Sequence, residues 1–297
     1  MTVQAQSLGF VGLGVMGGPM CRNVATKHPS PVLAFDLNET ALNEVLEAGA
    51  RRAGSVAEVA AAADVVFLSL PRGKQVEAVC FGEGGITSTA KPGLVIVDLS
   101  TTAVAEARSI AARLAERGLQ FVDAPVARTR QAAQQGTLSI MVGAEPGLFA
   151  RVEPLLRYMG SDVTLCGETG CGQVVKLINN CLLFEHVAAL AEMMVTAERA
   201  GVAPATLIEA VSKGSGDSFA LRNHATKAML PREFPERAFP SDYVLKDLGY
   251  AIELARSCGV EPKLPMVAQD YYKAAVETGI GAKYFPAIIE LVDRSRR

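Results

Sequence analysis

Residues 9–18, GFVGLGVMGG, decide the fold, because they place three glycines in the pattern G-x-G-x-x-G between an apolar run and an amphipathic segment. In a strand–turn–helix unit the first glycine allows the tight turn, the second lets a pyrophosphate approach the backbone, and the third lets the helix pack on the strand. Free N–H groups at the start of the helix then bind phosphate. We therefore expect a dinucleotide site formed by Gly12, Leu13, Gly14, Val15, Met16 and Gly17.

The next apolar run, VLAFDL (residues 32–37), ends in a carboxylate, Asp36, that lies about 20 residues beyond the glycine turn. A carboxylate at this place accepts hydrogen bonds from the adenosine ribose hydroxyls and repels a 2′-phosphate. The residues that follow, Leu37 to Thr40, include no arginine for such a phosphate. The sequence therefore predicts NAD rather than NADP as the cofactor. The alternative is that Asp36 only ends the strand and caps the next helix.

Outward from this stretch, the first half of the chain alternates buried strands with amphipathic helices. ADVVFLSLP (63–71), GLVIVDLST (93–101) and LQFVDAPV (119–126) are apolar on both faces, which is typical of a parallel sheet covered on both sides. LSIMVGA (138–144) and DVTLCG (162–167) would add strands at an edge. This pattern predicts an α/β fold, a Rossmann-type doubly wound parallel sheet.

The pattern changes after Gly172, where apolar residues recur at the helical period over residues 173–200, 204–213, 245–258 and 265–278. A chain of 297 residues also exceeds the usual size of a single core. We therefore expect a dinucleotide-binding Rossmann domain over residues 1–167. An all-α C-terminal domain for substrate and oligomerisation would follow over residues 168–297.

Composition argues against several classes of partner. The net charge of −2 does not favour a nucleic acid or an anionic membrane, which attract a basic surface. The six cysteines lack CxxC pairs and metal-ligand spacing to a histidine, so we expect reduced, mostly buried thiols and no metal. Asparagine, glutamate and histidine interrupt the longest apolar stretch, residues 177–195, which argues against a membrane span. A cytoplasmic location follows as the expectation.

A candidate chemical site lies in GETGCGQVVKLINN, residues 167–180. Lys176 and Asn180 are four residues apart, so a helix would place both on one face. A lysine within an apolar helix is costly unless it has a role, and burial would lower its pKa toward neutrality, where it can transfer a proton. Asn179 adds a third polar group, which favours a lined site over a core. The alternative is a lysine whose stem lies along the surface with its ammonium group in water.

Together these motifs resemble the β-hydroxyacid dehydrogenase family, which includes 3-hydroxyisobutyrate dehydrogenase and tartronate semialdehyde reductase. The resemblance covers essentially the whole chain and rests on GFVGLGVMGGPM (9–20), DLSTT (98–102), DAPV…GTL (123–138), GxxxKxxNN (172–180) and Lys246-Asp247. It implies that Lys176 is the general acid/base, that Asn180 helps to hold the substrate, and that Ser100 and Asn179 also contact it. It further implies a cofactor site that includes Leu70, Pro71, Gln75, Thr101 and Lys246. Members of the family form dimers or tetramers, so a homodimer or homotetramer is expected.

The sequence departs from the family in one loop. Most members read Asp-Ala-Pro-Val-Ser-Gly-Gly, where the serine hydroxyl and glycine amides bind the substrate's carboxylate, whereas this chain has Ala127, Arg128 and Thr129 in the last three places. An arginine fork suits a carboxylate, sulfonate or phosphate, and the loop is similar to the Gly-Arg-Thr variant of sulfolactaldehyde reductases. We expect these three residues to contact an anionic substrate. The alternative is that Arg128 points to solvent while Thr129 replaces the serine.

The resemblance implies a NAD-dependent dehydrogenase of short 3-hydroxyacids, or the reverse semialdehyde reductase. Sulfolactaldehyde and tartronate semialdehyde reductases are the alternatives within this chemistry. An imine reductase shares the fold but usually has aspartate or tyrosine at the catalytic position, so Lys176 argues against it. A catalytically inactive nucleotide-binding module is a further alternative, and such relatives lose this lysine.

Overall fold

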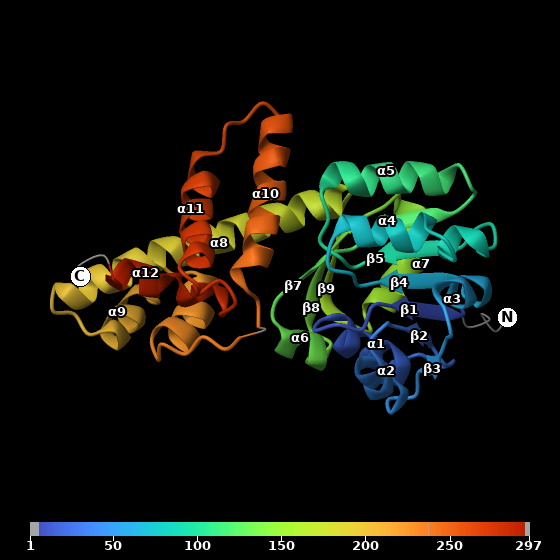
Figure 1. The fold of residues 1–297 in the computed structure, drawn as a ribbon, viewed down its shortest axis with the longest axis horizontal. Coiled ribbons are helices and arrows are strands. Elements are labelled where there is room, and N and C mark those ends of the chain that lie inside the picture. The colour runs from blue at the N-terminus through green and yellow to red at the C-terminus, as the bar shows by residue number, and fades with distance from the viewer. Residues whose placement is uncertain (1–5, 237, 295–297) are drawn as a thin grey trace. The chain divides into compact units, whose positions relative to one another are not determined.

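The computed structural model describes residues 6–236 and 238–294 of the chain. It consists of two compact units, Met1–Lys176 and Leu177–Arg297. The boundary falls inside one long helix, α8 (Cys171–Arg199), rather than in a loop. The first unit is a sheet covered by helices and the second is helical, as the sequence predicts (Figure 1).

A single sheet forms the centre of the first unit. Its strands follow the order β3-β2-β1-β4-β5-β6-β8-β7, and β9 pairs with β8. The strands are β1 (Leu8–Val11), β2 (Leu33–Phe35), β3 (Arg51–Arg52), β4 (Val65–Leu68), β5 (Val95–Asp98), β6 (Gln120–Asp123), β7 (Val126–Ala127), β8 (Leu138–Gly143) and β9 (Gly160–Gly167). From β3 to β6 all neighbours are parallel, so this part is a doubly wound sheet whose order reverses between β1 and β4.

The strand register aligns the carboxyl ends of four central strands. Val11 pairs with Leu68, Leu68 with Asp98, and Asp98 with Asp123. The segments that follow these residues are those in which the sequence predicts binding residues. Ligands of open α/β sheets bind at this edge, near the point where the strand order reverses. The fold therefore brings sequence-distant motifs to one side of the sheet.

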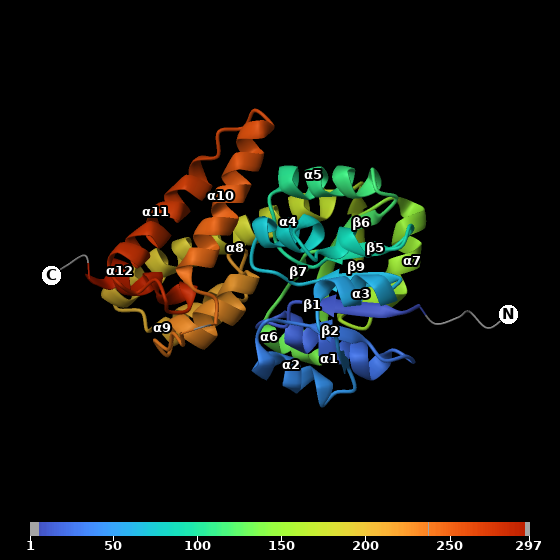
Figure 2. The ribbon, with the colours of Figure 1, turned by 45° about the vertical axis from the view of Figure 1, so that its right-hand side comes forward.

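Helices cover both faces of the sheet (Figures 1 and 2). One core lies under α1 (Gly17–Lys27), α2 (Glu39–Leu46), α6 (Arg130–Gln135) and α7 (Pro146–Leu156). The other lies under α3 (Val56–Ala62), α4 (Gly73–Phe81) and α5 (Val104–Ala115). Adjacent strand residues alternate between the two cores, as Phe67 and Leu68 do. This explains the continuous apolar runs in the sequence.

One edge of the sheet differs from the prediction in direction. The apolar run of residues 138–143 forms β8 as expected, but β8 is antiparallel to β6 and β7, and β9 runs parallel to β8. A short apolar run indicates a buried strand without giving its direction. The strand β7, the short helix α6 and β8 follow one another here, so the predicted substrate loop lies at this edge.

The second unit packs helices around an aromatic core. Phe184 of α8 lies against Tyr272 and Phe285, with ring centroids 5.9 and 5.4 Å away. The other elements are α9 (Pro204–Val211), η2 (Ala220–Met229), α10 (Ser241–Ser257), α11 (Lys263–Glu277), η3 (Phe285–Ile288) and α12 (Ile289–Arg294). The sequence did not predict η2, which is a π-helix. Its i→i+5 hydrogen bonds place apolar residues off the 3.6-residue period that sequence analysis detects.

The structure bears on two expectations drawn from composition, and it overturns the first of them. All six cysteines are free, as predicted, but only Cys21 and Cys80 are buried, so the thiols are not mostly buried. The helix α8 is long and apolar enough to cross a membrane by length and composition alone, because an 18-residue stretch of it has a mean hydropathy of 1.4, and 39% of that stretch is buried. Core helices of soluble proteins meet the same criterion, so this is weak evidence for a span.

Candidate active site

The three glycines of the turn after β1 have different structural roles. Gly12 has φ of 93°, and a Cβ there would lie 2.3 Å from the carbonyl oxygen of Ser69. A Cβ at Gly17 would lie 2.0 Å from the carbonyl oxygen of Gly12, because α1 begins against the turn. A Cβ at Gly14 would meet no atom within 4 Å. The fold thus requires the first and third glycines, whereas the second borders open space.

The open space at Gly14 lies at the start of α1. The N-cap residue Met16 has no side-chain oxygen, so its side chain does not satisfy the first N–H groups of the helix. Leu13 is buried, whereas Val15 is 48% exposed. Open backbone at an uncapped helix N-terminus fits a dinucleotide pyrophosphate, which such termini bind through N–H groups and the helix dipole.

Asp36 follows β2 and contacts the glycine turn directly. Its carboxylate accepts hydrogen bonds from the backbone N–H of Leu13 at 2.5 Å and of Asn38 at 2.7 Å. Asn38, rather than Asp36, caps α2, because its side-chain oxygen accepts from the N–H groups of Thr40 and Ala41. The alternative role for Asp36 as the helix cap is therefore wrong. The carboxylate lies where the adenosine ribose of a Rossmann-bound dinucleotide is expected.

Ser100 links the loops that follow β4 and β5. It is buried, and its hydroxyl oxygen accepts from the backbone N–H of Leu70 at 2.9 Å. Its carbonyl oxygen accepts from Nε2 of Gln173 at 2.8 Å, and Oε1 of the same glutamine accepts from the N–H of Thr102 at 3.1 Å. A buried glutamine at the start of α8 thus holds the loop after β5 at both ends. Sequence analysis missed Gln173, because its partners lie far away along the chain.

Four of the remaining residues implied for the cofactor lie in the same two loops and in α4, whereas the fifth, Lys246, lies in α10 of the second unit. Leu70 and Thr101 are half-buried, whereas Pro71 and Gln75 are exposed. All four follow the carboxyl ends of β4 and β5, so the structure places them on the same edge of the sheet as the glycine turn.

A second residue whose supporting role sequence analysis missed is Asp123, the last residue of β6 and the first of the DAPV motif. Its fully buried carboxylate accepts from the backbone N–H of Gly170 at 2.6 Å and of Gln173 at 2.8 Å. Burial raises the pKa of this carboxyl group, while the N–H groups that it accepts from act in the opposite direction. A Cβ at Gly172 would lie 2.8 Å from the same carboxylate. Asp123 therefore fixes the N-terminus of α8 to the sheet.

Lys176 is the last residue of the first unit, just after the segment that Asp123 and Gln173 hold. It is 8% exposed, so the alternative of a surface lysine with its ammonium group in water is wrong. Asn180 follows one turn later on the same helix, as the spacing predicts.

In the second unit, Asn180 takes part in a buried polar network. Its Nδ2 donates to Oδ2 of Asp247 at 2.7 Å, and Oδ1 of the same aspartate lies 3.2 Å from Nζ of Lys246. Both side chains of this ion pair are almost fully buried. Asn179 is exposed and donates to Oδ1 of Asn180 at 3.1 Å. The structure therefore joins four residues of two predicted motifs, and it adds a role for Asp247 that sequence analysis did not assign.

The predicted substrate loop lies between β7 and α6. Ala127 is buried in β7, and Thr129 is the N-cap of α6, with its hydroxyl oxygen near the N–H of Ala132 at 3.4 Å. Arg128 does not extend freely into solvent, because its guanidinium lies 2.7 Å from Asp162 of β9. Its contact with a substrate stays a prediction.

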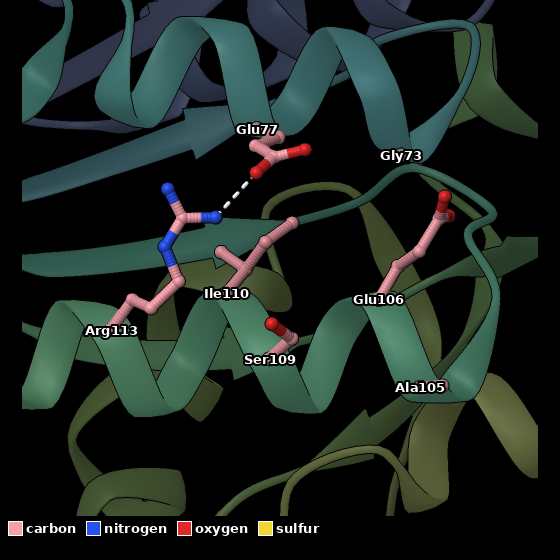
Figure 3. Close-up of a pocket in the computed structure, with 7 residues that line it drawn as sticks. All are labelled: Gly73, Glu77, Ala105, Glu106, Ser109, Ile110 and Arg113. Carbon is pink, nitrogen blue, oxygen red and sulfur yellow. Dashed lines mark hydrogen bonds and ion pairs between the residues drawn. The ribbon is translucent and has the colours of Figure 1, made fainter.

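A separate hollow of about 250 Å³ lies between α4 and α5 (Figure 3). An ion pair between Arg113 and Glu77 spans it. It is lined by Gly73, Glu77, Ala105, Glu106, Ser109, Ile110 and Arg113. The binding and catalytic residues predicted from the sequence are not among them.

Comparison with known proteins gives matches along the chain. Residues 7–167 match the model of the NAD binding domain of 6-phosphogluconate dehydrogenase, and residues 170–292 match the model described as NAD-binding of NADP-dependent 3-hydroxyisobutyrate dehydrogenase. The 2-(hydroxymethyl)glutarate dehydrogenase of Eubacterium barkeri is 37% identical, over 96% of this chain and 94% of its own. The 2-hydroxy-3-oxopropionate reductase of Escherichia coli (strain K12) is 32% identical, over 96% and 97%. A solved structure of Mycobacterium tuberculosis 3-hydroxyisobutyrate dehydrogenase with L-serine has a TM-score of 0.88 at 29% identity, over 97% and 99%.

Proposed function

The chain belongs to the β-hydroxyacid dehydrogenase family, and from this premise we propose that it is a NAD-dependent dehydrogenase of short 3-hydroxyacids, or the semialdehyde reductase that runs the reaction in reverse. The observation that carries the proposal is the buried Lys176, on a helix whose start is held by Asp123. A buried amine so positioned is suited to proton transfer. An inactive nucleotide-binding module would have no need of it.

In this mechanism the bound nicotinamide dinucleotide supplies the hydride chemistry, and the protein supplies position and charge. During oxidation Lys176, as the neutral amine, takes the proton of the substrate hydroxyl. During reduction its ammonium form returns that proton to the forming alkoxide. The amide of Asn180 holds the substrate, and Asp247 fixes that amide in one orientation by accepting from its Nδ2. No step requires a metal, and the described residues contain no cluster of metal-binding side chains.

The substrate class follows from what the relatives' substrates have in common. 2-(Hydroxymethyl)glutarate and 3-hydroxyisobutyrate both carry a hydroxymethyl group on the carbon that bears the carboxylate. 2-Hydroxy-3-oxopropionate is the aldehyde form of the same unit. We propose that this chain acts on a short acid of this kind. Tartronate semialdehyde, another name for 2-hydroxy-3-oxopropionate, and sulfolactaldehyde are alternative substrates.

The choice of NAD over NADP rests on Asp36. Its carboxylate lies beside the glycine turn, and a 2′-phosphate at the ribose would face this negative charge. One family model is described as NADP-dependent, and a comparison of kcat/KM for NAD and NADP tests the preference proposed for this chain.

The proposed assembly is a homodimer or homotetramer. Large apolar side chains of the helical unit are exposed, among them Ile178, Leu182 and Met193 of α8, each about half exposed at 51, 49 and 53%. An apolar stripe of this kind favours burial against another subunit. Light scattering on the purified protein measures the assembly directly. Six free thiols suit a reducing compartment, which supports a cytoplasmic location.

Replacement of Lys176 tests the proposed function. Lys176→Ala should lower kcat about 10²–10⁴-fold, the usual contribution of a general acid or base, while NADH binding stays nearly unchanged. Lys91→Ala, at an exposed lysine of the same unit, is the matched control and should retain full activity. The assay follows NADH with 3-hydroxyisobutyrate, glycerate, L-serine and 2-(hydroxymethyl)glutarate. A variant that keeps more than about a tenth of wild-type kcat contradicts the role of Lys176. NADH binding without turnover on any short hydroxyacid or semialdehyde would instead support the inactive module.

A further inference from the structure

Arg128 has an unusual backbone conformation. Its φ is 86°, and among the described non-glycine residues only Arg232 shares a positive φ. The left-handed region brings Cβ close to the backbone, so it favours glycine, the residue that the family pattern has at this place. An arginine here is strained unless its side chain makes contacts that offset the strain.

The guanidinium of Arg128 makes such contacts with β9 and with Thr137, the residue before β8. Its Nη1 donates to the carbonyl oxygen of Thr137 at 2.6 Å and to the hydroxyl of Ser161 at 3.0 Å, and its Nη2 lies 2.7 Å from Oδ2 of Asp162. Ser161 donates its own proton to the same carboxylate at 2.7 Å. Hydrogen bonds from Ser161 and Arg128 hold the pKa of Asp162 below its usual range, so the carboxylate is charged at neutral pH. The guanidinium of Arg128 thus already donates to groups of the protein itself.

The other end of this loop segment, residues 127–136, is hydrogen-bonded to α1, the helix that follows the glycine turn. Nδ2 of Asn23, on α1, donates to the carbonyl oxygens of Ala133 and Gln134 at the end of α6, at 2.8 and 3.2 Å. Gly136 then turns the chain with φ of 67°, and a Cβ there would lie 2.6 Å from Nζ of Lys27. The segment 127–136 is therefore fixed to β9 at its start and to α1 at its end.

We propose that Arg128 is a positioning residue, which pins the substrate loop to β9 through Asp162 instead of binding the substrate's anion. The pin fixes the backbone of residues 127–129, where the substrate's acid group is expected. This inference rests on the proposed function of the loop, but the pin itself can be tested without turnover. It also makes Ser161 and Asp162, outside every sequence motif, part of the machinery that sets substrate affinity.

A double-mutant cycle separates a pin from a substrate ligand. If Arg128 is a pin, Arg128→Ala and Asp162→Ala should each raise KM about fivefold with kcat nearly unchanged, and the double variant should do no more than one single change. Arg128→Lys keeps the positive charge but not the planar guanidinium, so its KM should lie between those of the wild type and Arg128→Ala. A neutral substrate analogue should be affected equally. If instead Asp162→Ala leaves KM unchanged or lowers it while Arg128→Ala raises it, Arg128 binds the substrate and the proposal is overturned.

Limited trypsin digestion tests the pin independently of activity. Cleavage after Arg130, which is exposed at the start of α6, should become about fivefold faster in both single variants, because the loop is held at one end only. The matched control is Arg113→Ala, which breaks the ion pair between Arg113 and Glu77 shown in Figure 3. The two ion pairs are similarly exposed: the side chains of Arg113 and Glu77 are 39% and 51% exposed, and those of Arg128 and Asp162 are 40% and 56% exposed. The cleavage rate of Arg113→Ala after Arg130 should equal that of the wild type. Unchanged cleavage in the two loop variants would overturn the pin, even in a protein without dehydrogenase activity.

Discussion

Two alanine substitutions three residues apart should have opposite effects. At Gly17 an added Cβ would lie 2.0 Å from the carbonyl oxygen of Gly12, whereas at Gly14 it would meet no atom within 4 Å. Gly17→Ala should therefore damage the fold and Gly14→Ala should not. If the open space at Gly14 receives a pyrophosphate, Gly14→Ala should instead lose the cofactor.

The expected magnitudes follow from these distances. Ordinary van der Waals contact needs about 3.4 Å, so Gly17→Ala must displace the turn or α1 by more than 1 Å. Overpacking of this kind costs about 3 kcal/mol, the upper end of the usual range, which lowers the Tm of a unit of this size by about 6–12 °C. Gly14→Ala should change stability by less than about 1 kcal/mol. A methyl group in the path of the phosphate should weaken dinucleotide binding at least about tenfold.

Thermal unfolding and NADH titration measure the two effects separately. The chain contains no tryptophan, so the fluorescence of NADH reports binding without energy transfer from that residue. Wild-type protein should gain stability with NADH, whereas Gly14→Ala should unfold at the wild-type temperature without ligand and gain less stability when NADH is added. Normal NADH affinity in Gly14→Ala would show that the phosphate does not approach this turn. Wild-type stability of Gly17→Ala would refute the packing argument.

Three further changes test other parts of the structure. Asp36→Ala should raise kcat/KM for NADP relative to NAD at least about tenfold, and a wild-type protein that uses both cofactors equally would contradict the role of this carboxylate. Asp123→Asn should lower the free energy of unfolding by about 1.5–3 kcal/mol in a urea titration, since a charged acceptor of two N–H groups is lost, and an unchanged midpoint would show that α8 starts without it. Burial lowers the pKa of His224 from 6.5 to about 4, so between these pH values the imidazole is protonated in the unfolded chain and neutral in the folded protein. The free energy of unfolding should therefore fall, by up to about 3 kcal/mol, as pH drops from 6.5 to 4, and His224→Gln should flatten that dependence if its stability at pH 7 is retained.

The sequence predicted those features of the fold that depend on local pattern. The runs 63–71, 93–101 and 119–126 contain β4, β5 and β6, because residues buried on both faces leave a continuous apolar signal. The direction of β8 could not be predicted, since the apolar pattern of a strand is the same in either direction. The π-helix η2 was missed because its repeat is not the one that the pattern search recognises.

For the site too, the sequence predicted only what is contained in a local pattern. The glycine turn was recognised because its spacing is contained within a few residues. Asp123 and Gln173 were missed as supports, because their partners lie 47 and 71 residues away along the chain, and only the strand register brings them together. Arg128 was recognised as unusual, but its partner Asp162 lies on a strand that no motif marks.

The boundary inside α8 determines how this enzyme can be recombined with its relatives. Lys176 is the last residue of the sheet unit, and the bonds that hold the start of its helix come from Asp123 and from the loop after β5 within that same unit. A chimera joined after Lys176 would inherit the proposed general acid/base from the parent that supplies the sheet unit. It would take Asn180, Lys246 and Asp247 together from the other parent, so their hydrogen bond and ion pair would stay matched. The position at which the two units can be exchanged between relatives therefore lies between Lys176 and Leu177, within a continuous helix. A search for interdomain linkers would not find it there.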